Sequence, residues 1–312
     1  MNNLSPLKIV FMGTPDFAVP TLETLHASHH TIQAVVTVPD KQQGRGRKSR
    51  PSAVKETAMK LGLPVLQPEK LRDPEFAQQL RMLNPDLVVV VAFRILPEDI
   101  FTIPVLGSFN LHASLLPKYR GAAPIHWALL NGDKETGVTT FFLKRSVDTG
   151  NIITQSSIPI EQDDNLYSLY SKLCELGAGV VLDTVNMIAS GSFEAGVQDN
   201  SLASPAPKVT TETRQLNFSE SALQCHNRIR AFAPKPGAFT HRSGVSLKIL
   251  TSAVVEGKGN PGEIIELSAD SFTIACANLA LQVHSVQPES KKAMDAASYL
   301  RGNPMRIGEQ LG

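Results

Sequence analysis

The stretch Asp86-Leu87-Val88-Val89-Val90-Val91 decides the fold, because it is apolar on both of its faces. A strand with two apolar faces must be covered on both sides, which is typical of a central strand in a parallel sheet. Similar runs precede it at 7–13 and 32–38, and helical patterns fill the intervals. Strands that alternate with helices in this way predict an α/β domain with a mostly parallel, Rossmann-like sheet.

The alternation continues to about residue 190 and then changes in character. Three more strands and a long helix are predicted at 108–113, 138–143, 152–160 and 165–188. Residues 201–207 are small, polar and rich in proline, which is typical of a linker. The remainder carries one helical pattern and several short strand patterns, as in a small OB-like β-barrel. The sequence therefore predicts two domains, at 1–206 and 207–312.

Composition excludes several classes of protein. The 312 residues include 30 Lys and Arg against 29 Asp and Glu, for a formal charge of +1, so the protein is not uniformly coated with positive charge. The longest apolar run, Leu87 to Phe93, is far shorter than the roughly 18 residues that span a bilayer, so we expect no membrane span. The first residues carry no secretion signal, which predicts a cytoplasmic location.

The three cysteines, Cys174, Cys225 and Cys276, stand about fifty residues apart. Zinc sites use close cysteine pairs and disulfide frameworks use an even count, so neither is predicted. No histidine motif suggests a metal either. We expect three reduced, buried thiols and no metal site.

The first strand runs into the turn Gly13-Thr14-Pro15-Asp16. A dinucleotide site needs a second glycine where this chain has Pro15, because the backbone there must approach a pyrophosphate. Asp16 also places a negative charge where the phosphate would lie. The pattern argues against a nicotinamide or flavin site, and we interpret Asp16 as the cap of the next helix.

Asn110 and His112 lie two residues apart in an extended, apolar context. Their side chains therefore leave the same face of a strand, where they can offer an amide donor and an imidazole to a common point. A carboxylate would orient such an imidazole and stabilise its charged form. Asp148 is the best candidate, since it lies in a turn between two predicted strands.

The segment from Ser114 to Gly121 reads Ser-Leu-Leu-Pro-Lys-Tyr-Arg-Gly, between Asn110-x-His112 and a distant Asp148-x-Gly150. With these motifs the chain resembles the folate-dependent formyltransferases. The resemblance implies that Asn110, His112 and Asp148 are catalytic and that 10-formyltetrahydrofolate is the co-substrate. It implies that Asn110 donates to the oxygen of the formyl group, that His112 is a second donor, and that Asp148 orients His112.

Three further segments, 10–18, 39–48 and 228–238, resemble the members of this family that act on a charged tRNA. The implied acceptor is the amino group of methionine on initiator tRNA. Alternatives remain open: transfer to a small amine, hydrolysis of the folate, or a non-catalytic RNA-binding relative. The second domain and a basic loop count against a small acceptor, and the intact catalytic residues count against the last alternative.

The resemblance also implies the folate site. It places the pteridine beside the loop after the central strand and beside the Ser-Leu-Leu-Pro segment, where an apolar wall with exposed backbone amides suits a flat heterocycle. The implied residues are Phe93, Arg94, Ile95, Leu96, Ser114, Leu115, Leu116 and Pro117. Arg94 stands where many relatives have a small residue, so its own role stays open.

Positive charge is distributed unevenly along the chain. Residues 41–50 carry five positive side chains and two glycines, a pattern that fits either a solvated loop or a loop that contacts a phosphate backbone. The resemblance favours tRNA contact, with Arg45 as the first candidate. Residues 208–312 hold 12 Lys and Arg against 9 Asp and Glu. The implied tRNA-binding residues are Lys41, Arg45, Arg47, Lys48, Arg50, Arg228, Arg230 and Lys235.

Few aromatic residues are available in the second domain to stack on bases. We therefore expect the protein to contact the tRNA backbone, with an affinity that falls steeply as salt increases. We expect it to act as a monomer.

Overall fold

The computed structural model describes residues 5–43 and 48–312. Its contacts divide the chain into two compact units. The first gathers the chain up to Gly121 together with 136–158 and 170–206, and the second gathers 122–135, 159–169 and 207–312. Two segments of the predicted first domain, 122–135 and 159–169, thus belong to the second unit. The division into domains at 1–206 and 207–312 stays a prediction.

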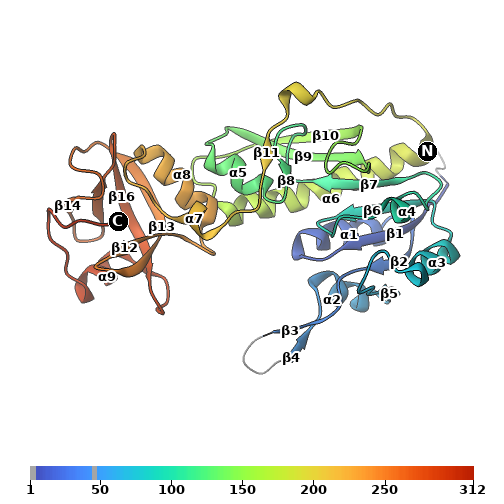
Figure 1. Ribbon diagram of the computed structural model, residues 1–312, viewed down its shortest axis with the longest axis horizontal. Helices are drawn as coiled ribbons and strands as arrows, with labels where there is room; N and C mark the ends of the chain where they lie inside the picture. Colours follow the sequence, from blue (N-terminus) through green and yellow to red (C-terminus); the bar gives the residue numbers. More distant parts are fainter. Residues whose placement is uncertain (1–4, 44–47) are drawn as a thin grey trace. The chain divides into compact units, whose positions relative to one another are not determined.

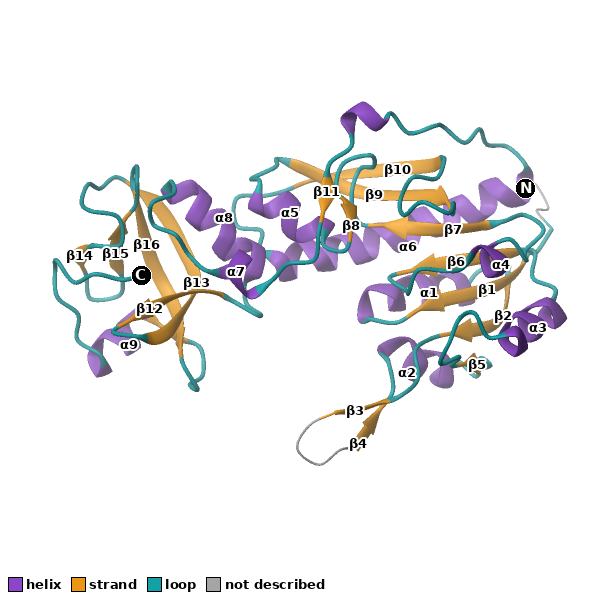
Figure 2. Ribbon diagram, in the orientation of Figure 1, coloured by secondary structure: helices purple, strands orange, loops and turns teal. Residues whose placement is uncertain are grey.

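The first unit is built on a seven-stranded sheet (Figure 2). Its strands are β1 (Lys8–Gly13), β2 (Thr31–Val36), β5 (Val65–Leu66), β6 (Leu87–Val91), β7 (Ser108–His112), β9 (Glu135–Phe142) and β10 (Ile152–Pro159). The spatial order is β10-β9-β7-β6-β1-β2-β5, parallel from β7 through β5, with β9 antiparallel to β7. The prediction of a mostly parallel sheet in an α/β fold is confirmed.

Helices cover this sheet on both faces, as the apolar strands require (Figure 1). They are α1 (Val19–His26), α2 (Ala53–Lys60), α3 (Pro74–Leu83), α4 (Glu98–Phe101) and α6 (Leu166–Ser190). Val10, Met12, Val88 and Val90 form a buried cluster with α3 and α4 on one face. Strand β6 is buried at all five positions, which explains why its sequence carries no alternation.

Helix α6 packs closely on the sheet. A Cβ at Gly177 would lie 2.7 Å from Leu111 of β7, and the Thr184 and Thr140 hydroxyls are 2.8 Å apart. By length and composition alone this helix could cross a membrane, and half of its most apolar window is buried inside the structure. Core helices meet the same composition test, and these contacts with β7 and β9 account for the apolar face of α6 within the fold.

The glycine turn differs in detail from the expectation. Asp16 opens a short 3₁₀ helix (Asp16–Ala18) and does not cap α1, whose N-cap is Ala18 without a side-chain hydrogen bond. The Asp16 carboxylate instead accepts a hydrogen bond from Phe17 N, at 3.1 Å, and one from the Tyr170 hydroxyl on α6, at 2.5 Å. Burial and this carboxylate raise the pKa of Tyr170 far above its usual value.

The second unit carries an antiparallel sheet. Its strands are β12 (Ala238–Arg242), β13 (Val245–Val255), β14 (Ile264–Leu267), β15 (Phe272–Ala275), β16 (Ala280–Pro288) and β17 (Met294–Asp295). They follow the order β12-β13-β16-β15-β14, with β17 beside β16. The expected smaller β domain after the α/β domain is confirmed.

Helices complete the second unit: α5 (Pro124–Leu130), α7 (Thr211–Arg214), α8 (Ala222–Phe232) and α9 (Ala296–Gly302). Helix α8 begins at a capping box, in which Ser221 and Gln224 bond to each other's backbone N–H groups. It packs on α5 through His126 and Phe232, whose ring centroids are 5.4 Å apart. The one helical pattern expected in this part of the chain corresponds to α8, whereas β12, β17, α7 and α9 were not predicted.

Candidate active site

Asn110 and His112 both lie on β7, near the carboxyl end of the parallel strands. Asn110 pairs with Val90 of β6, and Val90 pairs in turn with Met12 of β1. Residues that pair across neighbouring strands point to the same face, so Asn110 and His112 face away from α6, which contacts Leu111. The carboxyl edge of such a sheet is where open α/β folds bind ligands.

The Asn110 side chain is half-buried and has no hydrogen-bond partner within the described part of the chain. Both of its amide hydrogens are therefore available to a bound molecule. A half-buried amide of this kind is a suitable donor for negative charge that develops on an oxygen.

The His112 ring is held from two sides. Its Nε2 lies 2.8 Å from the carbonyl oxygen of Tyr119, and the ring packs edge-on against Phe141, with centroids 6.5 Å apart. A carbonyl oxygen only accepts, so Nε2 carries a hydrogen, and Nδ1 is the ring nitrogen that lies toward Asp148. The residue is 6 % exposed, and its tautomer and orientation are thus set before any substrate binds.

Asp148 reaches this site from the turn between β9 and β10. Its carboxylate Oδ2 lies 3.9 Å from His112 Nδ1 and accepts a hydrogen bond from Gly121 N at 2.9 Å. The separation from His112 is too long for a direct hydrogen bond, so the interaction is between charges once Nδ1 is protonated. Asp148 itself has a positive φ of 54°, in the left-handed region that few non-glycine residues adopt.

Gly150 allows this turn to approach β9. A Cβ at Gly150 would lie 1.5 Å from the carbonyl oxygen of Phe142, so no other residue fits without moving the strand. Gly121, which donates to Asp148, is likewise restricted, with a φ of 130° and a Cβ position 2.6 Å from the Ala206 carbonyl oxygen. The two glycines of the sequence motifs are therefore explained by close backbone approach.

The Ser114 to Pro117 segment is held rigidly beside β9. Thr139 Oγ1 donates to the Ser114 carbonyl at 2.6 Å and accepts from Leu116 N at 3.0 Å, while Gln155 Nε2 donates to the Leu116 carbonyl at 2.8 Å. Both backbone groups of Leu116 are thus used inside the protein, contrary to the expectation of exposed amides at that residue. The half-buried side chains of Leu115 and Pro117 remain able to contact a ligand.

The loop after β6 carries four residues that the resemblance assigned to the folate site, and they lie in different environments. Ile95 is 74 % exposed, Phe93 is half-buried, and Leu96 is buried within the core cluster under α3 and α4. Arg94 donates to the carbonyl oxygens of Glu69, at 3.0 Å, and Pro68, at 2.8 Å. Its guanidinium lies 5.3 Å from the Phe93 ring centroid. Arg94, whose role the sequence left open, therefore links its own loop to residues 68–69. Burial lowers the pKa of its guanidinium.

The described residues of the basic segment, 41–43 and 48–50, form two short paired strands where a loop was expected. Strands β3 (Lys41–Gln43) and β4 (Lys48–Arg50) pair antiparallel, and Lys41 is opposite Arg50. Arg45 and Arg47 lie outside the described residues, and Arg50 is exposed. At the base of the hairpin the Asp40 carboxylate lies 2.7 Å from Lys55 Nζ, which holds the pKa of Asp40 below its usual value.

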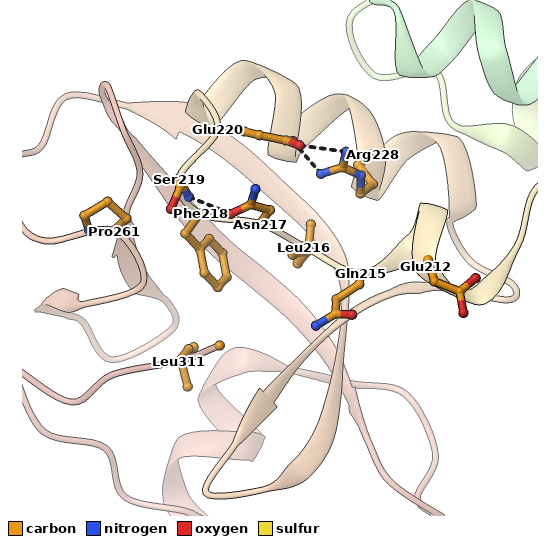
Figure 3. A pocket seen from close by; sticks show the side chains of 11 residues that line it. Glu212, Gln215, Leu216, Asn217, Phe218, Ser219, Glu220, Arg228, Pro261 and Leu311 are labelled. Carbon is orange, nitrogen blue, oxygen red and sulfur yellow. Dashed lines mark hydrogen bonds and ion pairs between the residues drawn. The ribbon is translucent and has the colours of Figure 1, made fainter.

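The implied tRNA-binding arginines of the second unit are both engaged inside it. Arg228 makes a two-pronged ion pair with Glu220, at 2.6 and 3.2 Å, in the wall of a pocket of about 470 Å³ (Figure 3). Arg230 donates to the carbonyl oxygens of Glu161, Gln162 and Asp164. A phosphate contact would have to replace these bonds, so their assignment to tRNA stays a prediction. Lys235 is exposed and forms no ion pair with the described residues.

Because of the environment of His226 on α8, we expect the stability of the second unit to depend on pH. Its Nδ1 lies 3.0 Å from Ser252 Oγ, and burial together with the nearby charge of Arg230 lowers its pKa to about 4. In the unfolded chain His226 has a pKa near 6.5, so between pH 6.5 and pH 4 the unfolded chain binds more protons than the folded protein. The stability that the neutral, buried imidazole provides is therefore complete above about pH 6.5 and is lost as the pH falls toward 4. We expect this loss to reach about 1–2 kcal/mol, since the imidazole is partly solvated.

The measurement is urea unfolding of the wild type and of His226→Gln at pH 7 and pH 5. His30 and His126, whose pKa values are also lowered by burial, act in the same direction, so the difference between the two proteins is the relevant quantity. The exposed His284 provides a matched control, His284→Gln. An equal loss of stability in wild type and His226→Gln would contradict the assignment.

Within residues 5–43 and 48–312, no three His, Cys, Asp or Glu side chains lie in a group that could hold a metal ion. Cys174, Cys225 and Cys276 are buried free thiols. The expectation of chemistry without a metal stays a prediction.

Gln198 is a residue of this site that sequence analysis did not identify. Its side-chain amide contacts the Asp148 turn from a segment 50 residues further along the chain, just before the segment expected to be a linker. No local motif marks it, and only the folded arrangement brings it to the site.

Comparison with known families agrees with these features. Residues 7–185 match the formyl transferase family and residues 208–304 match the formyl transferase C-terminal domain. The first match alone covers more than half of the chain, and it contains Asn110, His112 and Asp148. The chain belongs to the formyl transferase family.

Within that family the chain is similar over its whole length to proteins named methionyl-tRNA formyltransferase. That of Moorella thermoacetica is 45 % identical over 309 residues, which cover 98 % of this chain and 99 % of the relative. That of Caldanaerobacter subterraneus subsp. tengcongensis is 44 % identical, with 98 % and 100 % covered. That of Chlorobium phaeovibrioides is 44 % identical, with 99 % of each covered.

Solved structures share the fold at lower identity. The N-formyltransferase from Helicobacter canadensis, crystallised with folinic acid and dTDP-3-aminofucose, is 24 % identical with a TM-score of 0.68 and covers 90 % of this chain and 99 % of its own. Glycinamide ribonucleotide transformylase 1 from Symbiobacterium toebii is 19 % identical with a TM-score of 0.52, over 62 % of this chain and 95 % of its own.

Proposed function

We propose that this protein transfers a formyl group from 10-formyltetrahydrofolate to the amino group of methionine on initiator tRNA. One observation carries the proposal: Asn110, His112 and Asp148 converge at the carboxyl edge of the sheet, in a chain 40–45 % identical throughout to methionyl-tRNA formyltransferases. The product is formylmethionyl-tRNA, which serves in the initiation of translation.

The chemistry has two requirements that the three residues can meet. The neutral amine attacks the formyl carbon, which gives a tetrahedral centre with a negative oxygen and a positive nitrogen. Asn110, whose amide hydrogens are unpaired in the described structure, donates to that oxygen, an interaction of about 3 kcal/mol in comparable sites. His112, protonated at Nδ1, supplies a second positive donor that Asp148 stabilises.

Collapse of the tetrahedral centre completes the transfer. The amine nitrogen loses a proton, the bond from the formyl carbon to N10 of the folate breaks, and N10 takes up a proton. His112 Nδ1, the Asp148 carboxylate or a bound water can carry this proton between the two nitrogens. The new amide and tetrahydrofolate are the products, so atoms and charge balance without another reagent.

The folate site in this proposal is the surface formed by the two loops at this edge. Ile95 and Phe93 from one loop, and Leu115 and Pro117 from the other, offer apolar surface for a flat ring. Leu96 and Leu116 lie beneath them as core residues, and Arg94 holds its loop in place. The co-substrate is thus assigned to rigid elements beside Asn110.

The tRNA component of the proposal depends on charge. Residues 208–312 carry an excess of three positive side chains, and the β3–β4 hairpin adds five within ten residues. Exposed cations attract a phosphate backbone and release its counterions on binding. Lys235 and the hairpin, including Arg45, are the assigned contacts, and the expected monomeric state and cytoplasmic location remain part of the proposal.

Removal of one hairpin charge tests this assignment. We expect Arg45→Ala to weaken tRNA binding and to reduce the slope of log Kd against log salt by about 1, because one phosphate contact is lost. The measurement is tRNA binding between low and physiological salt. Lys60→Ala, an exposed cation on α2, is the matched control. An unchanged slope for Arg45→Ala would mean that this segment is a solvated loop that does not contact the tRNA.

The proposed function itself is tested by mixing the protein with 10-formyltetrahydrofolate and methionyl initiator tRNA at low salt. We expect formylmethionyl-tRNA to accumulate and to require all three components. A folded protein that binds the tRNA but forms no product would be a non-catalytic relative. Release of free formate without product would instead indicate a folate hydrolase.

A further inference from the structure

The Gln198 side chain bonds to the backbone of the turn that carries Asp148. Its Nε2 donates to the Asp148 carbonyl at 2.9 Å and to the Gly150 carbonyl at 2.8 Å. Its Oε1 accepts from Arg120 Nε at 3.1 Å and from Arg120 Nη2 at 2.6 Å. The residue is 6 % exposed, so these bonds are largely shielded from water.

The chemistry of its partners fixes the orientation of this amide. Carbonyl oxygens only accept and a guanidinium only donates, so the Gln198 nitrogen must face the turn and its oxygen must face Arg120. Both amide hydrogens and both oxygen lone pairs are then used. Such a fully satisfied, buried amide is a rigid link between the Asp148 turn and Arg120.

The segment that carries Gln198 is attached on both sides of it. Gly196 and Ile152, at the start of β10, exchange two backbone hydrogen bonds of 2.8 Å. Further on, Ser204 accepts from Tyr119 N through its hydroxyl and from Arg120 N through its carbonyl, each at 2.9 Å. The next residues form β11 (Pro205–Ala206), which pairs with β8 (Arg120–Gly121). Residues 201–206, expected to be part of a linker, are thus held against this site within the first unit.

The other bonds of the Asp148 turn do not involve its carboxylate: Thr149 Oγ1 donates to the Ser146 carbonyl, Phe142 N donates to the Asn151 carbonyl, and Arg145 pairs with Glu98. Residues 144–147 before it are exposed, and Asp148 has a left-handed backbone conformation. Its carboxylate accepts one hydrogen bond, from Gly121 N on β8. β8 is therefore connected to the turn in two ways, directly through Gly121 and indirectly through Arg120 and Gln198.

We propose that Gln198, oriented by Arg120, is a positioning residue that holds the Asp148 carboxylate toward His112 during formyl transfer. The proposal rests on the proposed function of this site. Gln198 contacts no reacting atom; it acts through the backbone of residues 148–150. Supporting groups of this kind change rates by about 10- to 100-fold when they are removed, since small displacements of a catalytic group are costly.

Two substitutions test the proposal. Gln198→Ala removes both donors, and Gln198→Glu keeps the size and the contact with Arg120 but places an oxygen against two carbonyl oxygens. We expect each to lower kcat by about 10- to 100-fold with the KM values for folate and tRNA changed less than about threefold. Asn200→Ala is the matched control, because Asn200 also accepts from Arg120, at 2.9 Å, but makes no bond to the turn.

A double-mutant cycle with Asp148→Asn separates positioning from general support of the fold. If Gln198 acts through Asp148, Gln198→Ala costs little further activity once the carboxylate is gone. Losses that simply multiply in the double variant, or a Gln198→Glu enzyme within twofold of wild type, would overturn the inference. A wild-type protein without formyl transfer would instead reject the proposed function, so the two failures are distinguishable.

Discussion

Asp148→Asn is expected to lower kcat for formyl transfer by about a hundredfold or more, with little change in tRNA or folate binding. The carboxylate lies 3.9 Å from His112 Nδ1, the atom that is proposed to carry the positive charge during the reaction. An asparagine has nearly the same shape, and its oxygen can still accept from Gly121 N. The substitution therefore removes charge while it leaves the turn in place, and the loss should appear in single-turnover kinetics.

The control for this charge change is Asp183→Asn, at an exposed position on α6. It removes the same charge from the protein without touching the site, so its kcat should remain that of the wild type. Weakened tRNA binding with an unchanged single-turnover rate in Asp148→Asn would assign Asp148 to substrate binding. That result would contradict the chemical role given to it above.

Asn110→Ala is expected to produce a loss of similar size, about a hundredfold or more in kcat. Its amide is half-buried on β7 and has no partner among the described residues, so its removal breaks no hydrogen bond of the resting protein. Stability should change little, which separates a catalytic loss from a folding defect. Rapid-quench measurement of formyl transfer, beside a thermal unfolding curve, checks both parts.

Asn110→Asp refines the same prediction. It keeps the size of the side chain but replaces a donor with a negative group, which would repel a developing oxyanion. We expect it to be at least as slow as Asn110→Ala. A faster Asn110→Asp enzyme would mean that residue 110 removes a proton from the amine, and the oxyanion role would be wrong.

Much of the first unit could be predicted because its signals are local. The apolar runs at β1, β2 and β6 mark buried parallel strands, and Pro74 marks the start of α3. The Asn-x-His spacing on β7 correctly places two side chains on one face, since alternation in a strand has a period of two. These inferences need only neighbouring residues.

The parts that escaped prediction depend on contacts between distant residues. β8 and β11 are strands of two residues that exist only because 120–121 and 205–206 pair with each other. Gln198 likewise contacts Asp148 across 50 residues of chain. The polar, proline-containing composition of 201–207 is typical of a linker, and composition does not reveal which backbone a segment will bind.

The partners of charged residues could not be predicted for a related reason. A sequence shows that Arg228 and Arg230 are positive, but not that Glu220 and three carbonyl oxygens of 161–164 already bond to them. Partial burial of a guanidinium requires such partners, and they come from other elements. Lys235, in a turn between two prolines, stays exposed as expected for a surface cation.

The most direct test of the account is a competition between acceptors for one labelled formyl donor. The protein is given 10-formyltetrahydrofolate labelled in the formyl group, with equal concentrations of methionyl initiator tRNA, glycinamide ribonucleotide and a dTDP-linked amino sugar. We predict labelled formylmethionine at least about a hundredfold faster than either small product, and its loss in Asn110→Ala. Label that appears on the amino sugar or the ribonucleotide, with none on methionine, would contradict the account.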